Sequence, residues 1–196
     1  MLFESVLRDF IRLLPTSRLK KEKENVRALL LQRRRILTKE QVSECSAEVV
    51  AAIARERSFI EAKAVMLYYP VRNEIDLREL LTLAPNKTYL LPVTHRHSIE
   101  MRQYAANDKL HRGKYGIPEP DGNSYNGKVN LILVPGVGFD KNNHRIGRGG
   151  GYYDRFLKRF RYTMKIGVGY KFQLVDKLPF TTKDVKVDKV IVATKA

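Results

Sequence analysis

The chain has 196 residues, of which 43% are hydrophobic and 30% charged. This composition excludes general disorder and predicts one domain with its own core. The single cysteine, Cys45, excludes an internal disulfide, and no apolar run approaches the ~20 residues of a transmembrane helix. Charged residues interrupt the N-terminal apolar stretch that a signal peptide would need, so the expected compartment is the cytoplasm. The formal net charge of +16 fits two classes of partner, nucleic acids and anionic small molecules such as ATP.

The N-terminal segment is predicted to be an amphipathic helix. Residues 2–14 place their apolar side chains on one helical face, and Pro15 ends the segment. The pattern predicts a helical extension over residues 1–16 that packs on the domain or on a partner subunit. A helix lying on a membrane surface has the same pattern. Residues 17–196 are predicted to form the domain itself.

Helices and strands alternate through the rest of the chain. Helical spacing predicts helices at 17–37 and from a capping box at Thr38 to about Arg57. Later signals predict strands at 64–69, 88–93, 99–105, 129–134, 164–169 and 187–193, with a short helix capped by Asp76 and another at about 150–160. Residues 111–128 are rich in Gly and Pro and are predicted to be loop.

This alternation predicts an α/β fold, specifically a single-domain three-layer fold with a largely parallel or mixed sheet flanked by helices. In such sheets ligands bind beyond the carboxyl ends of the strands. The loops that follow Tyr69 and Val134 are therefore the expected location of the site.

The strongest local motif is Arg-Ile-Gly-Arg-Gly-Gly-Gly-Tyr-Tyr-Asp at 145–154, between a predicted buried strand and a predicted helix. Its glycines let backbone N–H groups approach a ligand closely. The helix N-terminus adds partial positive charge, and Arg145 and Arg148 can pair with phosphate oxygens. The motif predicts a phosphate-binding loop, although it is neither a Walker A loop nor the dinucleotide fingerprint. A flexible glycine turn with solvated arginines is the alternative.

Together with three further segments, this loop resembles the 5-formyltetrahydrofolate cyclo-ligase family, also called 5,10-methenyltetrahydrofolate synthetases. Pro-Gly-Val-Gly-Phe-Asp at 135–140 leads into the loop in the family's manner. The further segments are Lys-Glu-Asn-Val-Arg at 23–27, Asn-Glu-Ile-Asp at 73–76 and Tyr-Gly-Ile-Pro-Glu-Pro at 115–120. The resemblance extends from about residue 18 to the C-terminus.

The resemblance implies ATP- and Mg²⁺-dependent closure of 5-formyltetrahydrofolate to 5,10-methenyltetrahydrofolate, with release of ADP and phosphate. The γ-phosphoryl group would pass to the formyl oxygen and give an iminium phosphate, which N10 then attacks as phosphate leaves. Phosphoryl transfer needs positioning and charge neutralisation more than covalent help from the protein. By the same resemblance, Arg148 and Tyr152 are the catalytic residues.

The resemblance also implies which residues bind each ligand. The ATP-binding residues are Lys23, Arg27, Arg145, Gly147, Arg148, Gly149, Gly150, Gly151 and Tyr153. The substrate-binding residues are Tyr69, Glu74, Arg148 and Tyr152, and the Mg²⁺ ligands are Asp154 and Asp188. Many family members carry a His-Asp pair shortly before the second aspartate, where this chain has Lys183-Asp184.

Several of these residues have a plain structural interpretation as well. Lys23 and Arg27 lie one helical turn apart, where like charges repel unless they share an anion, but an ordinary solvated face has the same pattern. Asp154 suits a partner for the helix dipole, and Glu74 suits an acidic residue before a helix. His95 and His97 are expected to be surface histidines rather than metal ligands.

A basic nucleic-acid-binding module is the alternative function. It predicts arginine–aromatic clustering or a known nucleic-acid motif, and the sequence has neither. A different ATP-dependent or carrier role on the same fold is a third interpretation. The expected partners are therefore a folate and ATP, without nucleic acid and without a membrane span, in a monomer or weak homodimer.

Overall fold

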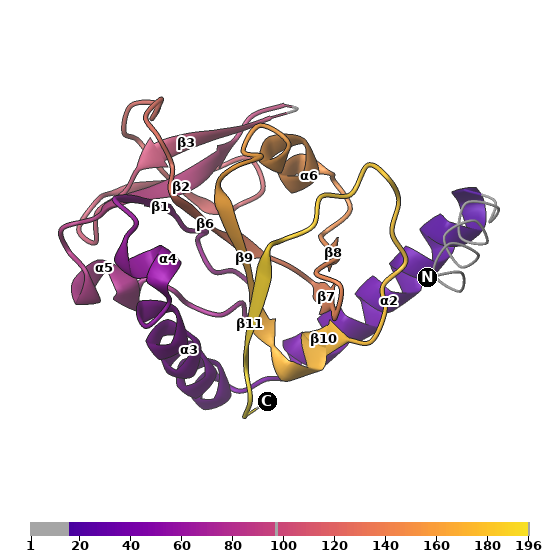
Figure 1. Cartoon of the computed structure of the whole chain (residues 1–196). Coiled ribbons are helices and arrows are strands. Elements are labelled where there is room, and N and C mark those ends of the chain that lie inside the picture. Colours follow the sequence, from indigo (N-terminus) through magenta and orange to yellow (C-terminus); the bar gives the residue numbers. More distant parts are fainter. Residues whose placement is uncertain (1–15, 97, 196) are drawn as a thin grey trace.

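The computed structural model describes residues 16–96 and 98–195, which are built around a six-stranded sheet (Figure 1). The strands run in the order β11-β9-β6-β1-β2-β3. Their bounds are β1 Ala64–Met66, β2 Thr88–Thr94, β3 Ile99–Gln103, β6 Leu131–Pro135, β9 Met164–Tyr170 and β11 Lys189–Ala193. All neighbours pair in parallel except β2 and β3, which are antiparallel. The largely parallel or mixed sheet expected from the sequence is confirmed.

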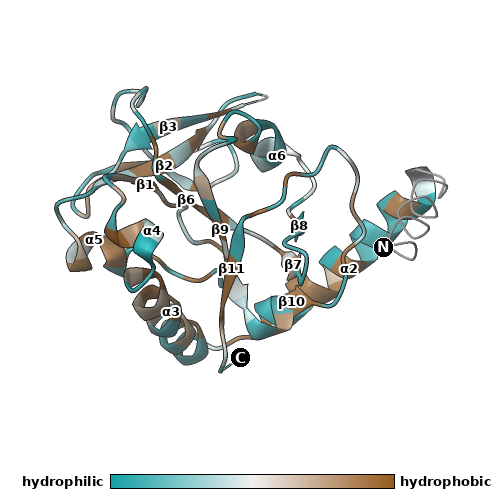
Figure 2. Ribbon diagram, viewed as in Figure 1, coloured by the Kyte–Doolittle hydropathy of each residue, from teal (hydrophilic) through white to brown (hydrophobic). Residues whose placement is uncertain are grey.

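Helices cover both faces of this sheet. The helices of the described residues are α2 Thr16–Arg35, α3 Lys39–Ala54, α4 Arg57–Ile60, α5 Glu79–Leu83 and α6 Tyr152–Leu157, and of these α2 packs mainly against a second, smaller sheet. Along β6, Leu131 and Leu133 belong to the hydrophobic cluster that includes the buried side of α3. The alternate residues Ile132 and Val134 belong to the cluster that includes α6. This alternation of the strand's two faces produces the expected three layers, and hydrophobic residues concentrate in the central strands (Figure 2).

A second, three-stranded sheet connects α2 to the rest of the molecule. It consists of β7 (Gly138–Asp140), β8 (Arg145–Ile146) and β10 (Leu174–Val175), with a 3-10 turn η1 (Lys171–Gln173) before β10. Leu30 of α2 packs with Val137, Ile146 and Leu178 in a separate small hydrophobic cluster. A Cβ atom at Gly138 would lie 2.5 Å from Leu30 Cδ1, so the helix can approach this closely only because the residue is glycine.

Several elements differ from the sequence prediction. Residues 111–128 are not entirely loop, because β4 (Leu110–Arg112) and β5 (Pro118–Pro120) form a short antiparallel hairpin. The turn expected after β6 contains β7 and β8. Helix α6 has six residues rather than about eleven, since it begins at Tyr152 instead of about Gly150 and ends at Leu157 instead of Phe160. Short segments without clear periodicity carry too little local signal for the sequence to predict them.

No helix in the described ranges is long and apolar enough to cross a membrane, and the cytoplasmic location stays a prediction. The amphipathic extension predicted for residues 1–16 lies outside the described residues, apart from Thr16, where α2 begins.

Candidate active site

Two loops meet at the carboxyl ends of neighbouring strands. Strands β1 and β6 pair in parallel, with Val65 opposite Leu131, so the loops that follow them leave the same edge of the sheet. The chain continues from β1 towards β2 on one side and from β6 towards β9 on the other. Such a reversal of strand order is the usual ligand position in open α/β sheets.

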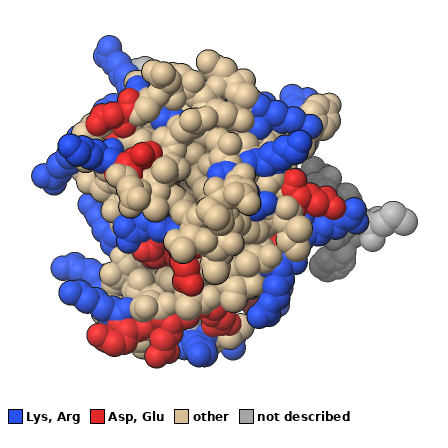
Figure 3. Space-filling view, turned by 90° about the vertical axis from the view of Figure 1, so that its left-hand side faces the viewer, with Lys and Arg blue, Asp and Glu red and all other residues tan. Residues whose placement is uncertain are grey.

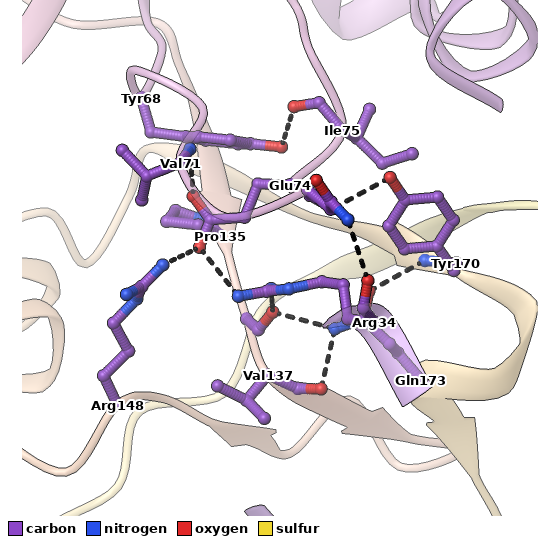
Figure 4. A network of polar contacts seen from close by, with 12 residues as sticks. Arg34, Tyr68, Val71, Glu74, Ile75, Pro135, Val137, Arg148, Tyr170 and Gln173 are labelled. Carbon is purple, nitrogen blue, oxygen red and sulfur yellow. Dashed lines mark hydrogen bonds and ion pairs between the residues drawn. The ribbon is translucent and has the colours of Figure 1, made fainter. Parts of the chain in front are cut away.

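Glu74, in the loop after β1, holds a carboxylate between two arginines. Arg148 Nη2 donates to Glu74 Oε1 at 2.8 Å, and Arg34 Nη2 lies 3.4 Å from the same oxygen (Figure 4). The backbone N–H of Val71 donates to the other oxygen, Oε2, at 3.2 Å. Glu74 is buried, so its charge needs these partners. The loop after β6 therefore reaches the loop after β1 through one ion pair.

The segment that presents Glu74 has an unusual backbone. Arg72 and Asn73 are consecutive non-glycine residues with left-handed φ angles of 52° and 59°, a conformation that costs an L-residue roughly 1 kcal/mol or more. Asn73 Nδ2 donates to the carbonyls of Arg34 and Leu37, at 3.2 and 3.1 Å, which satisfies carbonyl groups at the end of α2. Tyr170 donates its hydroxyl to the Asn73 carbonyl at 2.9 Å. These contacts fasten the loop to α2 and offset its strain.

The two arginines of the glycine-rich loop have different surroundings. The Arg145 side chain is 3% exposed, and its Nη2 lies 3.0 Å from Asp154 Oδ1. Its Nη1 donates to the Pro135 carbonyl at 3.4 Å, and its guanidinium lies 5.6 Å from the centre of the Tyr153 ring. The Arg148 side chain is 39% exposed. Arg145 therefore stabilises the loop through buried contacts, whereas Arg148 is the arginine that a ligand can reach.

The loop's glycines are required by its geometry. Gly149 and Gly151 have φ angles of +101° and +65°, which favour glycine. The carbonyl of Gly147 accepts a hydrogen bond from Arg27 Nε at 2.8 Å, and a Cβ atom at Gly147 would lie 2.7 Å from Arg145 Nη1. The following helix, α6, is only six residues long. Its dipole therefore contributes less positive charge than the sequence predicted.

Lys23 also lies at this side of the molecule, but with a different partner from Arg27. Lys23 Nζ forms an ion pair with Asp184, whose carboxylate also accepts a hydrogen bond from Thr181 Oγ1 at 3.0 Å. Burial by itself would raise the pKa of Asp184, but the hydrogen bonds from Lys23 and Thr181 outweigh burial and lower that pKa. The structure thus places Lys23 beside a half-buried carboxylate of the chain itself, which the sequence did not indicate as its partner.

Two tyrosines from distant segments meet at the surface of the site. Tyr115, in the turn between β4 and β5, and Tyr152, the first residue of α6, have hydroxyl oxygens 2.6 Å apart. Their ring centroids are 5.8 Å apart in an edge-on arrangement. The hydrogen bond with Tyr115 lowers the pKa of Tyr152, and Tyr152 also donates to the Arg96 carbonyl at 3.1 Å. The segment 115–120 that carries part of the resemblance therefore adjoins the glycine-rich loop.

The other predicted aromatic residues are less closely associated with Glu74. Tyr69 Oη accepts a hydrogen bond from Arg78 Nη1 at 3.2 Å, and the Arg78 guanidinium lies 5.1 Å from its ring centroid. The hydroxyl of Tyr153 is buried without a hydrogen-bond partner among the described residues. Burial raises the pKa of Tyr153, and the nearby charge of Glu74 adds to the increase.

Asp154 and Asp188 do not lie at the same edge of the sheet. Asp188 immediately precedes β11, and its Oδ2 accepts a hydrogen bond from the Lys165 backbone N–H at 2.7 Å at the start of β9. Its carboxylate also forms an ion pair with Lys165 Nζ at 3.0 Å. These are the amino ends of the strands, opposite the edge with Glu74. Over the ranges 16–96 and 98–195, the structure contains no group of three or more His, Cys, Asp or Glu residues that would hold a metal ion by themselves.

Arg34 is the residue of this site that the sequence analysis missed. It lies on the same face of α2 as Lys23, Arg27 and Leu30, at intervals of three or four residues that bring side chains to one side of a helix. That face turns towards the second sheet and the loops. The signal was present in the sequence, but Arg34 stands between Arg33 and Arg35, and the surrounding charges concealed the single buried one.

The fold and the site define the class of protein. An open, mostly parallel sheet that carries a glycine–arginine loop and a buried carboxylate at the carboxyl ends of adjacent strands is the architecture of an α/β enzyme.

Comparison with known proteins identifies the family. Residues 19–193 match the sequence model of the 5-formyltetrahydrofolate cyclo-ligase family. A 5-formyltetrahydrofolate cyclo-ligase of Escherichia coli K12 is 29% identical over 179 residues, covering 85% of this chain and 98% of the relative. A solved 5,10-methenyltetrahydrofolate synthetase of Aquifex aeolicus has a TM-score of 0.79 at 34% identity, covering 88% of this chain and 90% of the other. A solved 5,10-methenyltetrahydrofolate synthetase of Mycoplasma pneumoniae has a TM-score of 0.70 at 28% identity, covering 87% of this chain and 98% of the other. The chain therefore belongs to the 5-formyltetrahydrofolate cyclo-ligase family, as the resemblance indicated, and is an enzyme.

Proposed function

We propose that the chain converts 5-formyltetrahydrofolate to 5,10-methenyltetrahydrofolate in a reaction that uses ATP and Mg²⁺ and releases ADP and phosphate. The observation that carries this proposal is the contact between Glu74 and Arg148 at 2.8 Å. Glu74 belongs to the loop proposed to bind the folate, and Arg148 belongs to the loop proposed to bind the triphosphate. Two substrates that exchange a phosphoryl group must lie together, and these two loops do.

The chemistry requires a phosphoryl group because the formyl oxygen is a poor leaving group. The bond between the γ-phosphorus and the bridging oxygen of ATP breaks, and a bond forms from that phosphorus to the formyl oxygen. The product is an iminium phosphate at N5. N10 then attacks the formyl carbon, the carbon–oxygen bond breaks with loss of phosphate, and N10 loses its proton. The protein contributes mainly positioning and charge neutralisation to such a transfer.

The proposed residue roles follow from the two loops. Glu74 accepts hydrogen bonds from the pterin N–H groups, while Tyr69 and Tyr152 cover the faces of the ring. Arg148 moves between the folate and the phosphates and is, with Tyr152, a proposed catalytic residue. The other proposed ATP-binding groups are Lys23, Arg27 and the glycines at 147 and 149–151. The Arg145 guanidinium and the Tyr153 hydroxyl are buried, so we propose that these two residues support the loop rather than touch ATP.

Mg²⁺ supplies positive charge on the phosphate oxygens when it is bound. The Asp154 side chain is 22% exposed, and its hydrogen bonds from Arg145 and Val185 both end on Oδ1, so the other oxygen can face an ion. One or two carboxylates with substrate phosphates suffice for Mg²⁺, and the residues present fit that arrangement. We propose Asp154 as the carboxylate that holds it. Asp188, the second carboxylate that the resemblance implies, is held by Lys165 at the opposite edge of the sheet and does not reach the same ion in this arrangement.

The proposal is tested by the absorbance of methenyltetrahydrofolate formed from 5-formyltetrahydrofolate. We expect formation with ATP and Mg²⁺ together and none when either is omitted. Arg161→Ala is a matched control for arginine substitutions, because Arg161 is exposed in the segment between α6 and β9. Product formation without ATP would contradict the phosphorylated intermediate, and no formation under any condition would contradict the proposed reaction.

The net charge of +16 is the one observation that favours a nucleic-acid partner. On the face in Figure 3, Lys and Arg side chains lie in several separate places with Asp and Glu among them, rather than as one continuous basic surface. The salt dependence of binding to a random oligonucleotide tests this alternative. Tight binding at physiological salt with a steep salt dependence would favour it. The monomer or weak homodimer stays a prediction.

A further inference from the structure

Arg34 is a buried cation beside Glu74, where the end of α2 meets the loop after β1. Its side chain is 2% exposed, at the end of α2. Arg34 Nη1 donates to the Gly136 carbonyl at 3.4 Å, and Nη2 lies 3.4 Å from Glu74 Oε1 without forming a hydrogen bond to it. Nε and Nη2 have no hydrogen-bond partner in the described part of the chain.

Such an arginine is expensive for the fold. Burial lowers the pKa of Arg34, and the charge of Glu74 opposes this effect. A buried cation with unsatisfied donors destabilises the folded state unless an anion compensates it, and an apolar residue of similar length would avoid the cost. The Gly136 carbonyl does not depend on Arg34 either, because Gln173 Nε2 donates to it at 3.0 Å. The interaction that explains Arg34 is therefore its charge beside Glu74.

The polar residues around this pair serve the backbone rather than the carboxylate. Tyr68 donates to the Ile75 carbonyl at 2.8 Å, and Tyr170 donates to the Asn73 carbonyl at 2.9 Å (Figure 4). They hold the loop in place, and the cations beside the Glu74 carboxylate are Arg34 and Arg148, while the Val71 N–H donates to its other oxygen.

These two arginines differ in their freedom to leave Glu74. Arg148 is partly exposed and lies between Gly147 and Gly149 of the glycine-rich loop, so its side chain can turn towards another anion. Arg34 is enclosed by the loop, the second sheet and its own helix. If the triphosphate draws Arg148 away, Arg34 is the cation that stays beside the carboxylate, together with the Val71 N–H.

We propose that Arg34 is a positioning residue that keeps the Glu74 carboxylate directed at the folate after Arg148 has turned to the phosphates. This proposal rests on the proposed function, in which Glu74 binds the folate. Arg34 touches neither substrate and acts through Glu74.

The test compares Arg34→Gln with the exposed neighbour Arg35→Gln, which removes the same charge from the same helix end. We expect Arg34→Gln to weaken 5-formyltetrahydrofolate binding about tenfold or more, since a charged hydrogen bond is weakened. Calorimetry with a non-hydrolysable ATP analogue and Mg²⁺ present measures this, because Arg148 must be free to turn to the phosphates. The KM for ATP should stay within about twofold. Arg34→Lys, which retains the charge, should bind the folate more tightly than Arg34→Gln. Arg35→Gln should resemble the wild type.

A double-mutant cycle with Glu74→Gln separates positioning from a general structural role. Without the Glu74 charge, Arg34→Gln should cause almost no further loss of folate binding. Equal losses in both backgrounds, or equal changes in the folate and ATP affinities, would overturn the proposal. If Arg34→Gln does not fold, as judged by circular dichroism, Arg34→Lys in the two backgrounds decides in the same way.

The outcomes also distinguish an error in the proposed folate site from an error in the role of Arg34. If Glu74→Gln itself leaves folate binding unchanged, the proposed folate site is wrong, and the inference falls with it. If Glu74→Gln weakens folate binding but Arg34→Gln does not, the proposed function survives and only the role of Arg34 is refuted.

Discussion

Two buried cations lie at opposite edges of the sheet, and each pairs with a carboxylate. At the amino ends, Lys165 Nζ contacts the Thr163 carbonyl at 2.7 Å, the Phe160 carbonyl at 3.5 Å and Asp188 at 3.0 Å. These partners use all three donors of an ammonium group. At the carboxyl ends, Arg34 has one hydrogen bond, to Gly136, and its charge faces Glu74.

The difference is that the donors of Lys165 are all satisfied within the chain, whereas two donors of Arg34 have no hydrogen-bond partner among the described residues. Lys165 stabilises the segment before β9 and has no donor left for a ligand. An incompletely satisfied cation costs stability, and such costs persist at functional sites, where a ligand benefits from them. We therefore expect substitutions at the carboxyl ends of the strands to change activity and substitutions at the amino ends to change stability.

The largest effect is expected at Arg148. Replacing it with Ala should reduce kcat by at least ~10²-fold, about 2.7 kcal/mol, because its charge matters most as the phosphoryl group transfers. Arg148→Lys should recover part of the loss, since an ammonium group lacks the planar two-pronged contact. Steady-state kinetics provides the measurement, with Arg161→Ala as control. A folded Arg148→Ala protein with near wild-type kcat would remove this arginine from the mechanism.

Glu74→Gln is expected to act mainly on the folate. The substitution retains the shape of the side chain but removes its charge, which costs roughly 1.5–3 kcal/mol, or about 10- to 150-fold in affinity. The KM for 5-formyltetrahydrofolate should rise accordingly, while the KM for ATP changes little. The opposite pattern, with only the ATP value raised, would move Glu74 from the folate site to the nucleotide site.

Substitutions of Asp154 and Asp188, which lie at opposite edges of the sheet, should have different effects on the Mg²⁺ requirement and on stability. Asp154→Asn should raise the Mg²⁺ concentration needed for half-maximal activity several-fold, whereas Asp188→Asn should raise it less. Because Asp188 is 44% exposed beside buried Lys165, its substitution should instead cost roughly 1 kcal/mol, or about 2–4 °C in Tm. Titration of Mg²⁺ and thermal unfolding measure the two effects. Equal Mg²⁺ shifts would show that the edge does not distinguish the two carboxylates.

The smallest effect on activity is expected from deletion of residues 1–14. The deletion spares α2, which begins at Thr16 and carries Lys23, Arg27 and Arg34. Turnover should stay within a few-fold of the full chain, while solubility or stability falls if the apolar face of this segment covers another surface. Loss of ATP affinity on truncation would instead place this segment in the site.

The sequence by itself determined the features that depend on local chemistry or on a run of neighbouring residues. The capping box at Thr38 forms as predicted, with its two hydrogen bonds to Gln41 at 3.2 and 2.9 Å, because both partners lie within one helical turn. The apolar runs predicted most of the strands of the large sheet, and the spaced motifs identified the family. The rule for open sheets, once the strands were located, predicted the loops where the candidate site is proposed.

Only the tertiary structure decided which charges pair and which are buried. Tyr115 and Tyr152 are 37 residues apart in sequence, and Lys23 and Asp184 are 161 apart, so no local pattern relates them. Arg33, Arg34 and Arg35 look alike in the sequence. They differ because the rotation of α2 against the second sheet turns one of them inward, beside a carboxylate brought there by a strained loop from β1. Burial and pairing of charges depend on how whole elements pack, and periodicity alone does not specify that.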